Sequence, residues 1–129
     1  MQIEHLAIWV EDLEKMKGFY EQYFNGQAGE RYHNPKKSFY SYFISFDEGC
    51  RLELMHKADI PKNQNDVLKQ YIGIIHFAIS VGSEQKVNDL TNKLRADGYS
   101  IVGEPRWTGD GYYESVVLDP ENNWIEITA

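Results

Sequence analysis

The chain has 129 residues and a formal net charge of −7, from 13 basic and 20 acidic side chains. This acidic balance disfavours binding to nucleic-acid phosphates. No apolar run approaches the roughly 20 residues that cross a bilayer. The single cysteine, Cys50, cannot form an internal disulfide, and no secretion signal opens the chain. We therefore expect a cytoplasmic protein with neither nucleic acid nor membrane as a partner.

The first half of the chain predicts a strand, a helix and a hairpin. Apolar and other residues alternate over 2–10, which is typical of a strand with one buried face. Asp12 is the expected N-cap of an amphipathic helix that ends at Gly26. The segment 27–38 reads as a loop, with one short strand hidden within 27–35. Residues 39–55 predict a β-hairpin around an Asp-Glu-Gly turn.

The second half repeats this order. A strand over 74–81 precedes Ser83, a good N-cap, and a helix that Gly98 ends. The remaining expected segments are a short strand at 99–103, a loop at 105–111, a strand at 112–118, a turn at 119–123 and a last strand at 124–128.

The two halves also share a motif, because His-x-Ala-Ile-x-Val begins at both His5 and His76. The repeat predicts an α+β fold of two tandem βαβββ modules. Their expected limits are about 1–57 and 74–129, joined by a linker at about 58–73, within a single domain over residues 1–129.

Four residues at equivalent positions of the repeat carry chemistry. Glu53 and Glu126 each lie between two apolar strand residues, so each points away from the helix-covered core. The same alternation puts His5 and His76 on the faces opposite their apolar neighbours. Two imidazoles and two carboxylates are good ligands for a divalent metal such as Zn, Ni, Co, Mn or Fe. The alternative is that the histidines are core residues and the glutamates are solvated strand residues.

These residues resemble the vicinal oxygen chelate superfamily, which includes glyoxalase I, fosfomycin-resistance proteins, extradiol dioxygenases and bleomycin-binding proteins. The resemblance covers nearly the whole chain and implies a cupped mixed sheet around a metal site, in a homodimer. Its markers are the segments around His5, Phe19-Tyr20, Arg51-Leu-Glu53-Leu, Ile75-His76-Phe-Ala and Asp119-Pro120-Glu-Asn-Asn-Trp-Ile-Glu126-Ile.

The His-Glu-His-Glu set is most similar to that of bacterial-type glyoxalase I, or lactoylglutathione lyase. The resemblance implies that His5, Glu53, His76 and Glu126 bind the metal, with Ni, Zn or Co expected before Mn or Fe. It also implies that Glu126 is the catalytic base that moves a proton between adjacent carbons, with Glu53 assisting. The substrate would be a hemithioacetal or a related small oxygenated molecule.

Two positions depart from the glutathione-using members of that family. They usually carry an Arg where this chain has Trp9 and an Asn where it has Lys57. We therefore expect Trp9 and Lys57 to contact the substrate, together with Trp107 in the loop 105–111. The substrate could contain a thiol other than glutathione. The alternatives are a fosfomycin-resistance-type thiol transferase, which usually lacks a ligand at the Glu53 position, and a non-catalytic small-molecule-binding module.

Overall fold

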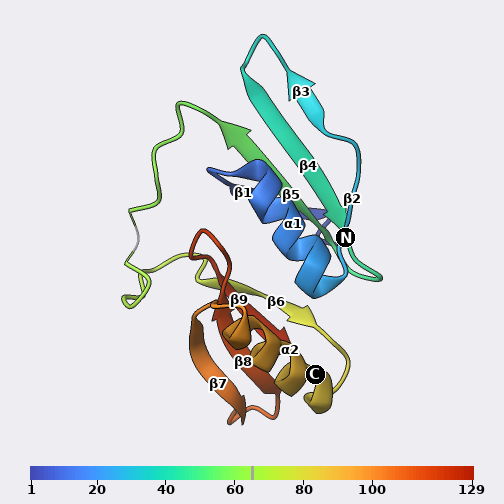
Figure 1. The fold of residues 1–129 in the computed structure, drawn as a ribbon, viewed down its shortest axis with the longest axis vertical. Helices are drawn as coiled ribbons and strands as arrows, with labels where there is room; N and C mark the ends of the chain where they lie inside the picture. Colours follow the sequence, from blue (N-terminus) through green and yellow to red (C-terminus); the bar gives the residue numbers. More distant parts are fainter. Residues whose placement is uncertain (65) are drawn as a thin grey trace. The chain divides into compact units, whose positions relative to one another are not determined.

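The computed structural model describes residues 1–64 and 66–129. The chain divides into two compact units, Met1–Gln64 and Asn65–Ala129, which we call the first and second modules. The boundary between them falls inside the predicted linker. Each module consists of one mixed sheet and one helix (Figure 1).

The first module has the strand order β1-β5-β4-β2, with β3 also paired to β4. The edge strand β1 runs parallel to β5, and the other pairs are antiparallel. The single short strand expected within 27–35 is in fact two, β2 and β3. The elements are β1 (His5–Trp9), α1 (Leu13–Phe24), β2 (Gln27–Ala28), β3 (Tyr32–Asn34), β4 (Phe39–Ser45) and β5 (Arg51–Lys57).

Helix α1 begins as predicted but ends one residue earlier. The Asp12 side chain accepts a hydrogen bond from the Lys15 backbone N–H at 3.0 Å. At the other end Asn25, and not Gly26, has the left-handed conformation, with a φ of 56°. Gly26 is needed for a different reason, because a Cβ there would lie 2.6 Å from Cγ2 of Ile44. The glycine lets the chain leaving α1 pass close to β4.

The second module has the strand order β6-β9-β8-β7, again with the first strand parallel to the last. Ser83 caps α2, as predicted, by accepting from the Lys86 N–H at 3.3 Å. The elements are β6 (His76–Ser80), α2 (Glu84–Ala96), β7 (Ile101–Trp107), β8 (Tyr113–Leu118) and β9 (Trp124–Thr128).

Strand β7 is longer than predicted, because it continues through Pro105 to Trp107, where a loop was expected. A proline cannot donate to a strand ladder and is tolerated on edge strands or at bulges. Strand β7 offers both, since it is the outer strand of its sheet and its register with β8 shifts on either side of Gly103.

The cores confirm the α+β fold of two βαβββ-type modules. In each module the helix packs on one face of the sheet, and the last strand sends alternate residues into that core. Leu52 and Leu54 are at most 2% exposed, and Ile125 and Ile127 are fully buried. In the described part of the chain, no helix is both long and apolar enough to cross a membrane.

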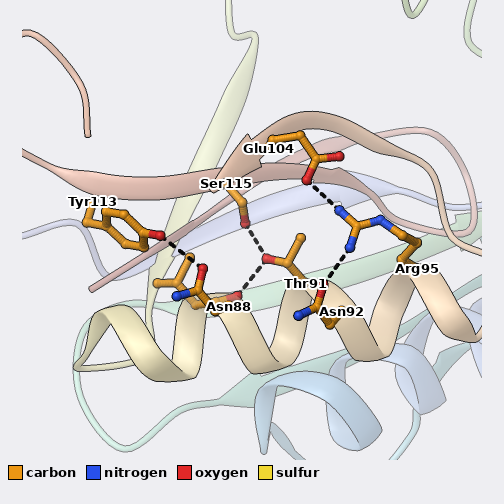
Figure 2. A network of polar contacts seen from close by, with 8 residues as sticks. Asn88, Thr91, Asn92, Arg95, Glu104, Tyr113 and Ser115 are labelled. Carbon is orange, nitrogen blue, oxygen red and sulfur yellow. Dashed lines mark hydrogen bonds and ion pairs between the residues drawn. The ribbon is translucent and has the colours of Figure 1, made fainter. Parts of the chain in front are cut away.

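Polar side chains fix α2 to its sheet, as Figure 2 shows. The Thr91 hydroxyl donates to the Val87 carbonyl at 2.6 Å and lies 2.7 Å from the Ser115 hydroxyl, with both residues fully buried. Because Thr91 has a single proton to donate, Ser115 donates to Thr91. At the helix surface, Tyr113 donates to Asn88 at 2.9 Å and Arg95 binds Glu104 at 2.5 Å.

Replacing Thr91 with valine tests this buried contact. Thr91→Val leaves the Ser115 hydroxyl without its Thr91 acceptor, which we expect to lower the free energy of unfolding by about 1–3 kcal/mol. The double variant Thr91→Val/Ser115→Ala removes both hydroxyls and should recover part of that loss. Urea unfolding of the wild type, Thr91→Val, Ser115→Ala and the double variant measures these free energies. A double variant that loses the sum of both single effects would contradict the contact.

Candidate functional site: two histidine–glutamate pairs

The first module brings His5 and Glu53 together on neighbouring parallel strands. Glu53 lies opposite Ala7, two residues after His5, so strand alternation puts both side chains on the same face. Nε2 of His5 lies 3.8 Å from Oε2 of Glu53, and the glutamate side chain is only 14% exposed. Leu52 and Leu54, on either side of Glu53, point into the core under α1.

The second module repeats this arrangement at equivalent positions. Glu126 lies opposite Ala78, two residues after His76, on the parallel pair β6 and β9. Nε2 of His76 lies 3.2 Å from Oε2 of Glu126, whose side chain is 19% exposed. We call the sheet face that carries the His–Glu pair the site face of each module.

Glu4 and Arg51 surround His5; the sequence pattern assigned a role to neither, although Arg51 begins one of the family markers. Nδ1 of His5 lies 2.5 Å from a carboxylate oxygen of Glu4, whose other oxygen binds the Arg51 guanidinium. The hydrogen bond from His5 and then the charge and hydrogen bond of Arg51 lower the pKa of Glu4. The guanidinium also lies over the Phe43 ring at 4.2 Å, and the His5 ring meets Phe43 edge-on at 5.4 Å.

This surrounding sets the proton position on the His5 ring. An ionised carboxylate only accepts hydrogen bonds, so the Nδ1 next to Glu4 is the nitrogen that carries the proton in the neutral imidazole. Nε2 then presents a lone pair toward the Glu53 carboxylate. Carboxylate–histidine contacts of this kind are typical of metal-binding histidines, because they fix the ring and raise its basicity.

The donor set of the two pairs fits a divalent cation. A neutral imidazole nitrogen and a carboxylate oxygen are both ligands for Zn, Ni or Co, and a bound cation would replace any proton that the two groups share. Within residues 1–64 and 66–129, no three or more His, Cys, Asp or Glu side chains are grouped so that they could hold a metal. Each module by itself therefore supplies two of the four predicted ligands.

Trp9 and Lys57 lie on the site face of the first module. Trp9 is 44% exposed, and its ring meets Phe39 edge-on at 6.0 Å. Phe39 in turn lies 6.1 Å from the Tyr32 ring, which extends an aromatic row along the sheet. Lys57 pairs with Phe39 in the ladder, and its ammonium group is held by Asp59 at 2.6 Å. Its charge is therefore already compensated by a carboxylate.

The structure does not bring Trp107 to the site face. Trp107 is a strand residue opposite Tyr113, and the two rings meet at 5.5 Å. Tyr113 points toward α2, where its hydroxyl donates to Asn88. Alternation therefore puts Trp107 on the helix-covered side of the sheet, away from Glu126.

Glu114 is a further carboxylate on the site face of the second module. Glu114 lies opposite Thr128 and Val116 lies opposite Glu126, so Glu114 and Glu126 share that face. Glu114 is only 8% exposed. Burial, and secondarily the charge of Glu126, raise the pKa of its carboxyl group. Arg106 binds one of its oxygens at 3.3 Å. Sequence reasoning missed Glu114 because its face depends on the β8–β9 register.

Comparison with known proteins gives a family match over almost the entire chain. The family model described as "Glyoxalase/Bleomycin resistance protein/Dioxygenase superfamily" matches residues 2–127. A Bacillus subtilis protein, YqjT, whose activity is uncharacterized, is 25% identical over 130 residues, covering 98% of each chain.

Solved structures share the fold at low sequence identity. The trypanothione-dependent glyoxalase I of Leishmania major superimposes with a TM-score of 0.79 at 21% identity, over 99% of this chain and 86% of the other. Glyoxalase I of Zea mays gives a TM-score of 0.78 at 21% identity over 98% of this chain, which spans only 44% of the maize protein. A glyoxalase-family protein of Enterococcus faecalis gives 0.78 at 19% identity, over 99% and 97% of the two chains.

The Glu4 contact makes a testable statement about His5. In the wild-type protein at neutral pH we expect the His5 ring to carry its proton on Nδ1, and Glu4→Ala should shift the tautomer population toward Nε2. Nitrogen-15 NMR of the imidazole distinguishes the two forms. Glu104→Ala is the matched control, because Glu104 is also exposed and paired with an arginine. A His5 spectrum that is the same in all three proteins would contradict this assignment.

Proposed function

Since the chain belongs to the Glyoxalase/Bleomycin resistance protein/Dioxygenase superfamily, we propose that it is a metal-dependent isomerase or lyase of the glyoxalase I type. The substrate is a hemithioacetal or a related small oxygenated molecule. The observation that carries the proposal is the duplicated His–Glu pair, at 3.8 Å in the first module and 3.2 Å in the second.

In this proposal His5, Glu53, His76 and Glu126 together hold one divalent metal ion, with Ni, Co or Zn as the first candidates and Mn or Fe next. Four separate lines support the set. The residues occupy equivalent register positions in the two modules. Their side chains offer only nitrogen and oxygen donors, which suit these metals. Glu4 orients the His5 ring. The two glutamate side chains are largely buried, and burying a carboxylate without a compensating positive charge is costly.

The metal, when bound, would polarise two neighbouring oxygens of the substrate and stabilise the negative charge that forms when a carbon loses its proton. Glu126 is the proposed base. Its carboxylate takes the proton from the carbon that bears the hydroxyl group and the sulfur, and returns it to the neighbouring carbonyl carbon. The hydroxyl oxygen loses its proton and becomes the thioester carbonyl, while the former carbonyl oxygen gains a proton.

The site face of the first module supplies the apolar side of the proposed substrate site. Trp9, Phe39 and Tyr32 form an aromatic row beside the His5–Glu53 pair. Such a row favours contact with the apolar part of a small ligand. Aromatic side chains also exclude water, which makes the nearby Glu53 carboxylate a better base. Glu53 assists Glu126 in this proposal. We also propose that the protein acts as a homodimer. Its substrate is a small molecule, of a class that includes thiol conjugates.

Variants of the histidines test the ligand set. We expect His5→Ala and His76→Ala each to weaken Ni or Zn binding by more than about 100-fold, which exceeds the 10–100-fold usual for residues that only support a ligand. His33→Ala is the control, because His33 stacks on Tyr40 at 4.3 Å on the opposite side of β4. Competition against a metallochromic chelator gives the affinities. Wild-type affinity in either site variant would exclude that histidine as a ligand.

Turnover of methylglyoxal hemithioacetals tests the reaction. With Ni, Co or Zn added in turn, we expect isomerisation of the adduct of at least one thiol, followed as thioester absorbance, with glutathione and cysteine as the first two thiols. Glu126→Gln should lower kcat by about 10²–10⁴-fold, because it removes the proton-transferring carboxylate. Glu104→Gln should keep wild-type activity, since Glu104 binds Arg95 on the helix side. Full activity of Glu126→Gln would overturn the assigned role.

A further inference from the structure

Arg106 extends from the edge strand β7 across the site face of the second module. It lies opposite Glu114 in the ladder, and its Nη2 is 3.3 Å from Oε1 of that residue. Because Glu114 shares its face with Glu126, the guanidinium lies on the same side of the sheet as the His76–Glu126 pair.

The backbone of β7 makes room for this side chain. A Cβ at Gly103 would lie 3.2 Å from Nη1 of Arg106 and 3.3 Å from the Val116 side chain. The guanidinium therefore lies over Gly103, where a larger residue would force it to shift by a few tenths of an ångström. The pairing of β7 with β8 shifts register between Gly103 and Arg106, as at a β-bulge. The absence of a side chain at Gly103, as well as the charge of Glu114, therefore allows the observed position of the arginine.

The polar groups beside Arg106 differ in how many of their hydrogen-bonding positions have a partner. Glu114 is 8% exposed and binds one edge of the guanidinium, while the Arg106 side chain remains 49% exposed. The Thr128 hydroxyl, opposite Glu114 in the ladder, is buried and has no hydrogen-bond partner among the described residues. A guanidinium has five N–H donors in a planar fork, so an arginine held on one edge still offers donors on its exposed side.

Cations on the site face of the first module are engaged differently. Arg51 binds Glu4 and lies over Phe43, next to a proposed metal ligand. Lys57 is held by the exposed Asp59. Trp9 offers no positive charge. Arg106 is therefore a cation on the site face of the second module that keeps donors available for an anionic group of a ligand.

We propose that Arg106, held by Glu114 over Gly103, is the substrate-anion-binding residue and selects a substrate that carries a carboxylate group. This assignment rests on the proposed function, because it names the substrate class for the same site. A planar guanidinium binds a carboxylate through two parallel N–H···O bonds, which a neutral amide of the same shape cannot accept equally.

Two probes that differ only in charge test the assignment by turnover. Methylglyoxal adducts of 3-mercaptopropionate and of 3-mercaptopropionamide have the same size, but only the first has a carboxylate. We expect wild-type protein to favour the carboxylate adduct in kcat/KM by about tenfold to hundredfold, mostly through KM. Arg106→Gln should abolish the preference. Arg95→Gln should keep it, because Arg95 is also paired with a glutamate but lies on α2. Preference retained in Arg106→Gln, or absent in wild type, overturns the proposal.

Direct binding separates this proposal from the reaction itself. NMR titration with succinate should shift the Arg106 side-chain N–H and the Gly103 amide signals, while succinamide should not. Failure of both adducts to turn over would count against the reaction, whereas absence of these succinate shifts would count against Arg106. The variant Arg106→Gln/Glu114→Gln avoids an unpaired buried carboxylate, in case the single variant does not fold. The Gly103 amide shift should also disappear in this variant, and a Gly103 shift that persists would refute the assignment.

Discussion

The parallel pairing of the first and last strands in each module is the constraint on which the rest of the molecule depends. It sets Ala7 opposite Glu53 and Ala78 opposite Glu126, so the histidine two residues earlier shares a face with the glutamate. A slip of one residue would turn each glutamate into the helix-packed core and each flanking leucine or isoleucine outward. Burial of those apolar neighbours therefore holds the His–Glu register in place.

The two modules keep the pair but differ in what lies around it. The first module surrounds His5 with Glu4, Arg51 and Phe43, and adds an aromatic row that begins at Trp9. The second module places a buried carboxylate, Glu114, and its arginine partner beside Glu126. The repeated His–Glu pair therefore has mostly aromatic neighbours in the first module and charged neighbours in the second.

Sequence patterns were sufficient for features that depend on local alternation. They predicted the repeat, both N-caps, the β4–β5 hairpin and the common face of each histidine and glutamate, because these follow from strand and helix periods alone. They missed the extension of β7 through Pro105, since a proline reads as a strand breaker unless the strand is known to lie at an edge. They also missed Glu114, Arg106 and Glu4. Those roles depend on ladder register and on contacts between residues far apart in sequence or at strand ends, which periodicity does not specify.

The central claim is that the two His–Glu pairs serve one metal ion. X-ray absorption spectroscopy of the nickel-loaded protein, with nickel and protein measured on the same sample, tests it most directly, because multiple scattering counts imidazole ligands. The account predicts one nickel per chain with two imidazoles and otherwise oxygen ligands. Two nickel ions per chain, each with one imidazole, would contradict it and would mean that the modules bind metal separately.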